Sequence, residues 1–420
     1  MRTFFVPAIS LGRRITLRKL GLKKVSSIVV LGLVPAVSPF GMCVHIPFLN
    51  QISSDLAITT FAVQNTITVY MFVFSLAIFA TAFVADIVSK RTLLLVSLLV
   101  FSAASFLGAA APSFEILMIA RCLQAMAAGI IVVMPYAIIQ EIESGAGLVK
   151  SVATISIIHS LMCSVIPLLG GVLTWFFDWR AAFWISGVYA AGMFMVEKNS
   201  QLPEVHKKPE SVEPSLLLGR VRKLIAQRQF LCSLVILSFG SALYYGFISV
   251  APVIVSEKLQ ASEFVCGALL FAMCAFWTIG NRVASIFQEK YGCVRALLLA
   301  LGLIGIGLIP LLFINGGTNL FSVLSLMIPY AIGGGILSPI IVATATSSDP
   351  KLAGVASSLL FSTQVMVGSL AAWFCSFFDL SSLKDITVFG MFTALVCLLA
   401  FKIMFVENFR PRIKVVEVEP

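Results

Sequence analysis

Charged side chains are scarce in this sequence of 420 residues: only 11% are Asp, Glu, Lys or Arg, while 59% are hydrophobic. Soluble domains usually carry about 25% charged residues, so the chain is not an ordinary soluble protein. Apolar runs of about 20 residues, long enough to cross a bilayer, recur along nearly the whole sequence. The alternating segments of about 10 residues that are typical of a membrane β-barrel are missing. The composition therefore predicts an all-α polytopic membrane protein.

Sequence signatures of bound metals and nucleotides are also missing. The nine cysteines include no C-x-x-C pair, and almost all fall in apolar runs, so we interpret them as small hydrophobic side chains. The three histidines show no ligand spacing, and no G-x-x-x-x-G-K-[ST] phosphate loop occurs. A membrane-embedded enzyme or a sensor would need a polar cluster at one membrane depth or an appended soluble domain. We therefore expect no metal, no bound cofactor and no enzymatic activity.

The apolar runs divide into twelve predicted spans, of which the sixth is the shortest. Their predicted ranges are 25–48, 60–85, 92–111, 114–140, 151–176, 180–197, 229–255, 263–288, 292–314, 320–346, 352–377 and 384–406.

The cations are distributed as the positive-inside rule requires for an even number of spans. With both termini in the cytoplasm, 25 of the 29 Lys and Arg residues fall on the cytoplasmic side. Only Arg180, Lys258 and Lys384 face the other side, and Arg121 lies inside the membrane. Because these cations flank the spans, the net charge of +10 indicates topology rather than a nucleic-acid partner.

One long polar segment, rich in Lys, Glu and Pro, divides the chain into two halves of six spans each. Weak internal similarity supports this division, since Pro135 in the fourth span corresponds to Pro339 in the tenth. Parallel repeats of this kind place a binding site at the interface of the halves. The predicted parts are a basic cytoplasmic arm (1–24), an N-terminal bundle (25–197), a cytoplasmic linker (198–228), a C-terminal bundle (229–406) and a cytoplasmic tail (407–420).

Arg121 and Gln124 in the fourth span are candidate site residues. They lie one helical turn apart and so share a helix face. A charge within the bilayer is costly and is usually paired or reached by water. The guanidinium could bind an anionic group or tune a nearby proton site; the alternative is a purely structural ion.

The string Pro167-Leu-Leu-Gly170-Gly171 in the fifth span predicts a tightly packed, bendable helix. Proline interrupts the helical hydrogen-bond ladder, and glycines let two helix backbones approach closely. Tight packing alone would explain the string, but sliding helices also need such a seam.

Asp86, Lys90 and Arg91 form a charged group in the loop after the second span. A carboxylate beside two cations can pair across the cytoplasmic mouth and form again at each closure. Topology charge is the alternative interpretation.

Three further groups are polar or aromatic. His45 and His159 could each titrate near neutral pH, although a buried, hydrogen-bonded histidine is the commoner case. Tyr244 and Tyr245 in the seventh span could line an aromatic cavity or face lipid.

These segments together resemble the drug:proton antiporters of the major facilitator superfamily, most closely the bicyclomycin/chloramphenicol-resistance (Bcr/CflA) branch. Arg121-x-x-Gln124 resembles the family's motif in the fourth helix. Pro167 to Gly171, followed by Trp179-Arg180, resembles its antiporter motif in the fifth helix. The segments 86–91, 338–339 and 353–358 resemble its loop after the second helix and its tenth and eleventh helices.

The resemblance implies roles at the matching positions only. Arg121 would belong to the proton or substrate site. Asp86 and Arg91 would belong to the cytoplasmic gate, together with the adjacent Lys90. Pro167, Gly170 and Gly171 would form the seam on which the halves rock.

The sequence also departs from the family pattern. Cys43 stands where the family often carries an acid in the first helix, and no Asp or Glu lies at the middle of a predicted span. Proton antiport usually uses a carboxylate, so coupling would run through His45, His159 or Glu141, or be altered.

The sequence therefore predicts a monomeric carrier in the bacterial inner membrane, exporting a small amphipathic drug, siderophore or metabolite by alternating access. The proton gradient would drive it, with Arg121, Gln124, His45, Cys43, Tyr244 and Tyr245 at the substrate or proton site. The alternative is an importer of a nutrient or chelate with the same fold.

Overall fold

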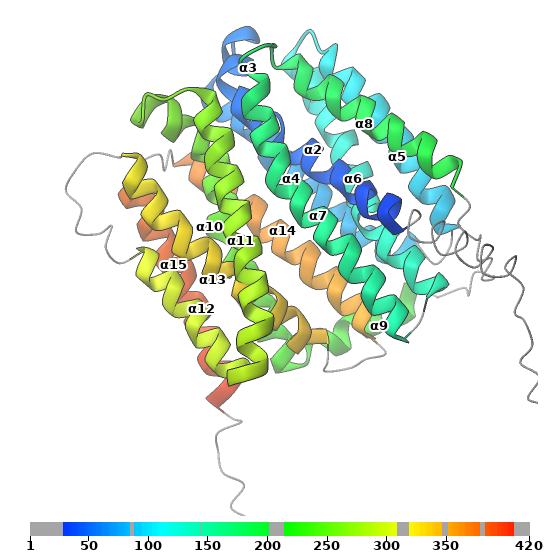
Figure 1. Ribbon diagram of the computed structural model, residues 1–420, viewed down its shortest axis with the longest axis vertical. Coiled ribbons are helices and arrows are strands. Elements are labelled where there is room, and N and C mark those ends of the chain that lie inside the picture. The colour runs from blue at the N-terminus through cyan, green and yellow to red at the C-terminus, as the bar shows by residue number, and fades with distance from the viewer. Residues whose placement is uncertain are drawn as a thin grey trace, which may run out of the picture.

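The computed structural model describes residues 28–84, 88–143, 145–200, 214–308, 319–346, 352–378 and 383–406, and within them the chain forms helices and no strands (Figure 1). Ten segments of these residues are long and apolar enough to cross a membrane. The prediction of an all-α polytopic membrane protein is confirmed. The predicted arm (1–24) and tail (407–420) lie outside the described residues.

The first apolar segment is a broken helix. Proline stands in the first turn of each of two 3₁₀ turns, at Pro35 and Pro47, because a residue without an amide hydrogen is tolerated there but not in a helix interior. The segment continues to Asp55, seven residues beyond the predicted end at residue 48. Its elements are η1 (Val34–Ala36), α2 (Val37–Cys43), η2 (Ile46–Phe48) and α3 (Leu49–Asp55).

The other helices before residue 200 agree with the predicted ranges to within a few residues, except that α7 begins earlier than predicted. They are α4 (Thr60–Val84), α5 (Lys90–Ala109), α6 (Phe114–Ile142), α7 (Gly145–Leu173) and α8 (Arg180–Lys198).

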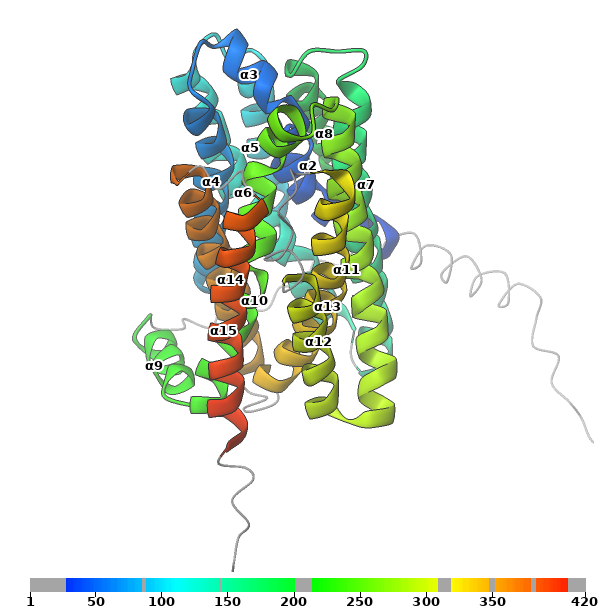
Figure 2. The ribbon, with the colours of Figure 1, turned by 90° about the vertical axis from the view of Figure 1, so that its left-hand side faces the viewer.

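The second part of the chain adds one helix that the hydropathy pattern did not predict, α9, within the polar linker. It also ends α10 in a π-helical turn. The elements are α9 (Pro214–Ile225), α10 (Arg228–Val253), η3 (Ile254–Lys258), α11 (Glu263–Tyr291), α12 (Cys293–Leu308), α13 (Leu320–Thr346), α14 (Ala353–Phe377) and α15 (Leu383–Val406). Figure 2 shows α9 at one end of the molecule, where it contacts α10 and α14.

Two helices, α8 and α12, stand at predicted spans but are not among the ten. The described part of α12 has 16 residues, and α8 carries Arg180, Glu197 and Lys198 at its ends.

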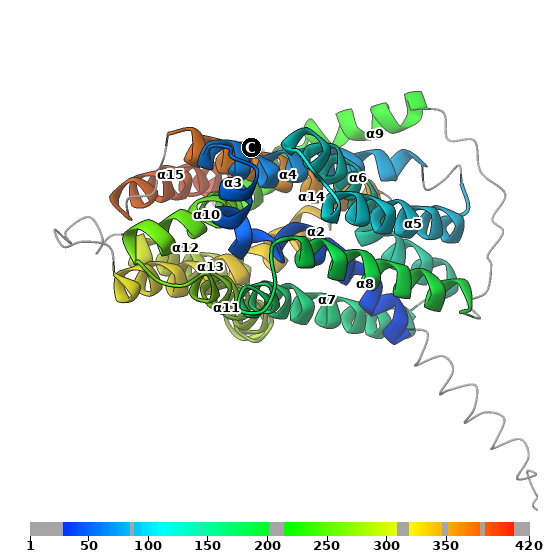
Figure 3. The same ribbon diagram turned by 90° about the horizontal axis from the view of Figure 1, so that it is seen from above.

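The two most extensive contacts between the part of the chain before residue 200 and the part after residue 228 are made by helix pairs. Helix α7 packs against α11, and α4 packs against α14. Figure 3 shows these pairs on opposite sides of the molecule. The remaining close helix pairs lie mainly within one part, such as α5 with α6 and α8, or α10 with α13, α14 and α15.

Candidate functional site

Arg121 on α6 is almost completely buried, with 1% of its surface exposed. Its Nη1 atom donates hydrogen bonds to the carbonyl oxygen of Gly41 and, at 3.0 Å, to Oε1 of Gln124. The guanidinium carbon lies 4.2 Å from the ring centroid of Tyr70. A desolvated guanidinium over an aromatic face gains cation–π attraction. No carboxylate pairs with Arg121 among the described residues, so backbone, amide and ring groups stabilise the charge.

Gln124 extends this contact to a third helix. Its Nε2 atom donates to Oγ of Ser105 at 2.8 Å, and that hydroxyl donates to the carbonyl oxygen of Phe101 at 2.7 Å. Both ends of the Gln124 amide are therefore bonded while the side chain is 1% exposed. The chain of bonds ties α6 to α5.

The partners of Arg121 all belong to the part of the chain before residue 200. Gly41 lies on α2, Tyr70 on α4 and Gln124 on α6 itself, and the ring of Phe183 on α8 lies 6.0 Å away. In this conformation the guanidinium does not line the interface with the second part of the chain. Its role in binding or proton transfer stays a prediction.

Spacing within α6 did not reveal Tyr70 or Gly41. Gly41 is required because a Cβ atom there would lie 2.9 Å from the Phe101 ring and would also meet the Tyr70 hydroxyl. The sequence feature that could have pointed to a partner for Arg121 was Tyr70, a single tyrosine within an apolar run.

His45 lies where the first helix breaks, between α2 and η2, with 1% of its surface exposed. Neither ring nitrogen has a hydrogen-bond partner among the described residues. The ring lies 5.9 Å from that of Phe183. Cys43, at the end of α2, is also buried. Buried polar groups normally have partners, so His45 is an exception in this fold.

Tyr244 and Tyr245 lie side by side on α10, with ring centroids 5.1 Å apart in an edge-to-face arrangement. The hydroxyl of Tyr330 on α13 accepts from the Tyr244 amide at 3.1 Å and donates to the Gly240 carbonyl at 2.7 Å. An α-helix ordinarily pairs that amide directly with that carbonyl. The Tyr330 hydroxyl therefore braces α10 at the turn that carries the two tyrosines.

Pro167, Gly170 and Gly171 lie in the last two turns of α7, which ends at Leu173. A Cβ atom on Gly171 would lie 3.1 Å from the Phe264 carbonyl oxygen and 3.2 Å from the Cα atom of Gly267, both on α11. A Cβ atom on Gly267 would lie 2.6 Å from the Pro167 carbonyl oxygen. Gly170 faces a different neighbour, the carbonyl group of Val44. The three residues therefore lie where helix backbones touch.

The candidate gate residues are only partly described. Asp86 lies outside the described residues. Lys90 forms an ion pair with Glu141 at the end of α6. Arg91 donates to the carbonyl oxygens of Glu197 and Ser200 at 3.1 and 2.8 Å. These partners all precede residue 201, so pairing across the mouth of the carrier stays a prediction.

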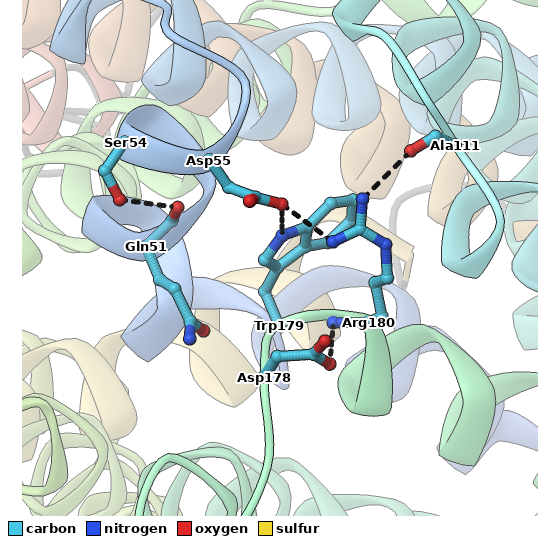
Figure 4. A network of polar contacts seen from close by, with 7 residues as sticks. All are labelled: Gln51, Ser54, Asp55, Ala111, Asp178, Trp179 and Arg180. Carbon is cyan, nitrogen blue, oxygen red and sulfur yellow. Dashed lines mark hydrogen bonds and ion pairs between the residues drawn. The ribbon is translucent and has the colours of Figure 1, made fainter.

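A second polar network, which spacing did not predict, lies where α3 and α5 end and α8 begins (Figure 4). Oδ2 of Asp55 accepts from Nε1 of Trp179 at 2.9 Å and from Nη1 of Arg180 at 2.7 Å. The Arg180 guanidinium carbon lies 4.3 Å from the Trp179 ring centroid. Nη2 of Arg180 also donates to the Ala111 carbonyl at 3.4 Å. The signal in the sequence was the lone acid that ends the first apolar run.

No group of three or more His, Cys, Asp or Glu residues in the described part of the chain could hold a metal ion. Arg121, Gln124, His45 and Cys43 lie among the first helices, whereas Tyr244 and Tyr245 lie on α10. The structure thus divides the six predicted site residues between the two parts of the chain.

Comparison with known proteins places these features in a family. The family model described as Major Facilitator Superfamily matches residues 31–372. Multidrug resistance protein D of Escherichia coli K12 is 25% identical over 80% of this chain and 85% of its own length. The bicyclomycin resistance protein homologue of Haemophilus influenzae is 23% identical over 82% of this chain and 87% of its own.

Solved structures share the fold at low identity. A peptide transporter POT in complex with sulfate superposes with a TM-score of 0.74 at 12% identity, covering 91% of this chain and 94% of the other. A bacterial homologue of the human lysosomal transporter Spinster, inward-facing and unoccupied, gives 0.71 at 13% identity, covering 91% and 96%.

Proposed function

Because the chain belongs to the Major Facilitator Superfamily and is therefore a membrane transporter rather than an enzyme, we propose that it exports a small amphipathic molecule by alternating access. The proton gradient supplies the driving force in this proposal. The relatives named for multidrug and bicyclomycin resistance support export. The choice of exporter over importer rests on them and on the Pro167–Gly171 seam.

The proposed architecture is twelve membrane helices in two bundles of six. Ten candidate spans, together with α8 and α12 at the remaining predicted positions, support that number. The proposed boundaries remain 25–197 and 229–406, with a cytoplasmic linker between them. Both termini lie in the cytoplasm of a bacterial cell, because 25 of 29 cations then obey the positive-inside rule. The carrier acts as a monomer in the inner membrane.

The contact between α7 and α11 is the single observation that carries the proposal. Two helices from different parts of the chain touch through glycine backbones at Gly171 and Gly267. Because backbone meets backbone at that point, the helices can change their angle there without large rotamer rearrangements of the contacting residues. Rocking of two repeats about such contacts is the motion that alternating access requires.

The Arg121 network takes a positioning role in this proposal. Arg121 holds α2 against α4 and α6 at the break in the first helix, next to the unpartnered His45. Protonation of His45, with His159 and Glu141 as alternative carriers, couples the broken helix to the proton gradient. Glu141 lies at the end of α6 paired with Lys90, which favours a gate role for that residue.

Transport by purified protein in liposomes tests the proposal. An imposed proton gradient of either sign is combined with a panel of fluorescent amphipathic compounds. Export coupled to protons predicts that a compound moves against its gradient only when protons flow in the opposite direction. Movement of the compound in the same direction as protons indicates the importer. Movement of the compound that does not depend on the proton gradient would show that transport is not coupled to protons.

A further inference from the structure

A group of sulfur and phenol side chains lies beside the contact between α7 and α11. The group, called here the thiol–phenol cluster, consists of Cys43, Cys163, Cys274, Tyr244 and Tyr245. Helix geometry places two of its thiols at one depth. Cys163 precedes Gly170 by seven residues on α7, and Cys274 follows Gly267 by seven residues on α11. Seven residues are two helical turns, or about 10 Å, and each thiol therefore stays near the face of its glycine.

The direction of the two helices brings these thiols together. Gly171 meets Phe264 and Gly267, while Pro167 meets Gly267. Moving backward along α7 therefore corresponds to moving forward along α11, which means that the helices run antiparallel. Cys163 and Cys274 consequently lie on the same side of the glycine contact. Cys43 lies next to Val44, whose carbonyl group touches Gly170 on α7.

The two tyrosines complete the cluster from α10. The Tyr244 hydroxyl lies 3.3 Å from Sγ of Cys274, and its ring centroid lies 5.4 Å from that of Trp277. Tyr245 packs over Gly368 on α14. Tyr244, Tyr245 and Cys163 are only half-buried, so the cluster presents accessible surface. These side chains offer flat aromatic faces and polarisable sulfur atoms, both of which favour contact with aromatic rings.

Two polar groups at the cluster are free to bind a ligand. The Tyr245 hydroxyl has no hydrogen-bond partner among the described residues, and the residue is partly exposed. The same holds for the ring nitrogens of His159. His159 lies one turn from Cys163 on the same face of α7.

Charge is the property that the cluster does not offer. None of the hydrogen bonds and ion pairs within the described residues joins a carboxylate to any of its five side chains. Arg121 bonds to Gly41, two residues before Cys43, but its side chain is 1% exposed and is also bonded to Gln124. A charged ligand would lose its hydration here without gaining a permanently charged partner, which is unfavourable.

We propose that the thiol–phenol cluster is the substrate-binding site and that it takes an uncharged, planar aromatic molecule bearing a hydrogen-bonding group. The aromatic rings and thiols contact the planar part of the molecule, and the Tyr245 hydroxyl and His159 bind its polar group. This inference rests on the proposed transport function and specifies its substrate class. Arg121 positions the first helix and does not touch the substrate.

Protection of native thiols from alkylation tests the site in the unmodified protein. Purified protein is treated with N-ethylmaleimide, and the rate of modification at each cysteine is followed by mass spectrometry. The probes share one ring system: an uncharged methoxycoumarin, an anionic coumarin carboxylate and a cationic trimethylammonium coumarin. The uncharged probe is expected to slow modification of Cys163 at least threefold, and the charged probes are not. Cys122 and Cys293, which are also half-buried, are internal controls whose rates stay constant.

Tyr245→Phe supplies the second arm. Removing the hydroxyl keeps the ring and should weaken binding of the uncharged probe about five- to tenfold, the value of one hydrogen bond. Tyr291→Phe, at the exposed end of α11, is the matched control. Equal protection of Cys163 by the charged probes, or none by the uncharged probe, overturns the inference. Liposome transport measured in parallel keeps the two proposals separate, because transport without protection of Cys163 leaves the proposed function standing.

Discussion

Gly171 of α7 and Gly267 of α11 meet backbone to backbone, so that a Cβ atom on Gly171 would lie 3.2 Å from the Cα atom of Gly267. Phe264 lies at the same contact. Since α7 and α11 belong to different parts of the chain, this contact fixes how closely those parts approach. Its effect is therefore expected on both stability and transport.

Gly267→Ala is predicted to separate the two helices. Its methyl group would lie 2.6 Å from the Pro167 carbonyl oxygen, and backbone on both sides leaves little room to adjust. Overpacking of this kind costs about 1–3 kcal/mol. We expect a lower melting temperature in detergent and a transport rate reduced at least tenfold. Gly302→Ala on α12, where an added Cβ meets open space, is the control. Equal melting temperatures and transport rates in the two variants would contradict a role for the α7–α11 contact.

Arg121→Lys is predicted not to replace arginine. The guanidinium bonds both Gly41 and Gln124 and lies over the Tyr70 ring, whereas an ammonium group lacks the planar fork that makes these contacts together. We expect a loss of about 2–3 kcal/mol in unfolding free energy, measured by denaturant titration in micelles. Arg295→Lys, at an exposed position on α12, should change nothing. Wild-type stability in Arg121→Lys would show that the network is dispensable.

The sequence was sufficient to predict the Arg121–Gln124 pair because both residues lie on one helix and local spacing determines which face they share. It was insufficient for Tyr70 and Gly41, since contacts between helices depend on how the helices rotate against each other. The same reason applies to Asp55, whose partners Trp179 and Arg180 lie more than 120 residues away. The positions of the membrane helices could be predicted from hydropathy. The position of α9 could not, because a short helix in a polar linker contains no long apolar run.

The Asp55–Arg180 ion pair is predicted to contribute modestly. Both side chains keep substantial exposure, 46% and 33%, and exposed ion pairs are worth about 0.2–1 kcal/mol. A double-mutant cycle with Asp55→Ala and Arg180→Ala should give a coupling energy in that range that decreases with added salt. Trp179→Phe should cost more than Arg180→Ala, because Trp179 is 1% exposed and its loss removes packing as well as a hydrogen bond. The reverse order would mean that the ion pair dominates.

Tyr330→Phe is predicted to affect substrate binding more than folding. Without the hydroxyl, the Tyr244 amide and the Gly240 carbonyl can bond to each other within α10, so the loss of stability should stay near 1 kcal/mol. The turn carrying Tyr244 and Tyr245 would shift, and the affinity for a transported compound should fall several-fold. Tyr136→Phe, which removes a weaker 3.4 Å contact to Ser156, is the control. Unchanged affinity in Tyr330→Phe would show that the hydrogen bonds of the Tyr330 hydroxyl to α10 do not influence substrate binding.

A reversible crosslink between α4 and α14 is predicted to stop transport. The Ser369 hydroxyl donates to the Thr68 carbonyl at 2.9 Å, so these positions lie close across the interface between the two parts of the chain. Thr68→Cys with Ser369→Cys should form a disulfide under mild oxidation and hold this conformation. Transport should then cease and return when a reductant is added, as alternating access requires the interface to open.

The control for this crosslink lies within one part of the chain. Ser249 on α10 donates to the Ala372 carbonyl on α14 at 3.2 Å, and both helices belong to the part after residue 228. Ser249→Cys with Ala372→Cys should crosslink as readily but leave transport intact, because helices that move as one body need not separate. If both crosslinks stopped transport, the moving unit would be smaller than a half of the chain. If neither did, α4 and α14 would stay together throughout the cycle, and rocking at that pair would be excluded.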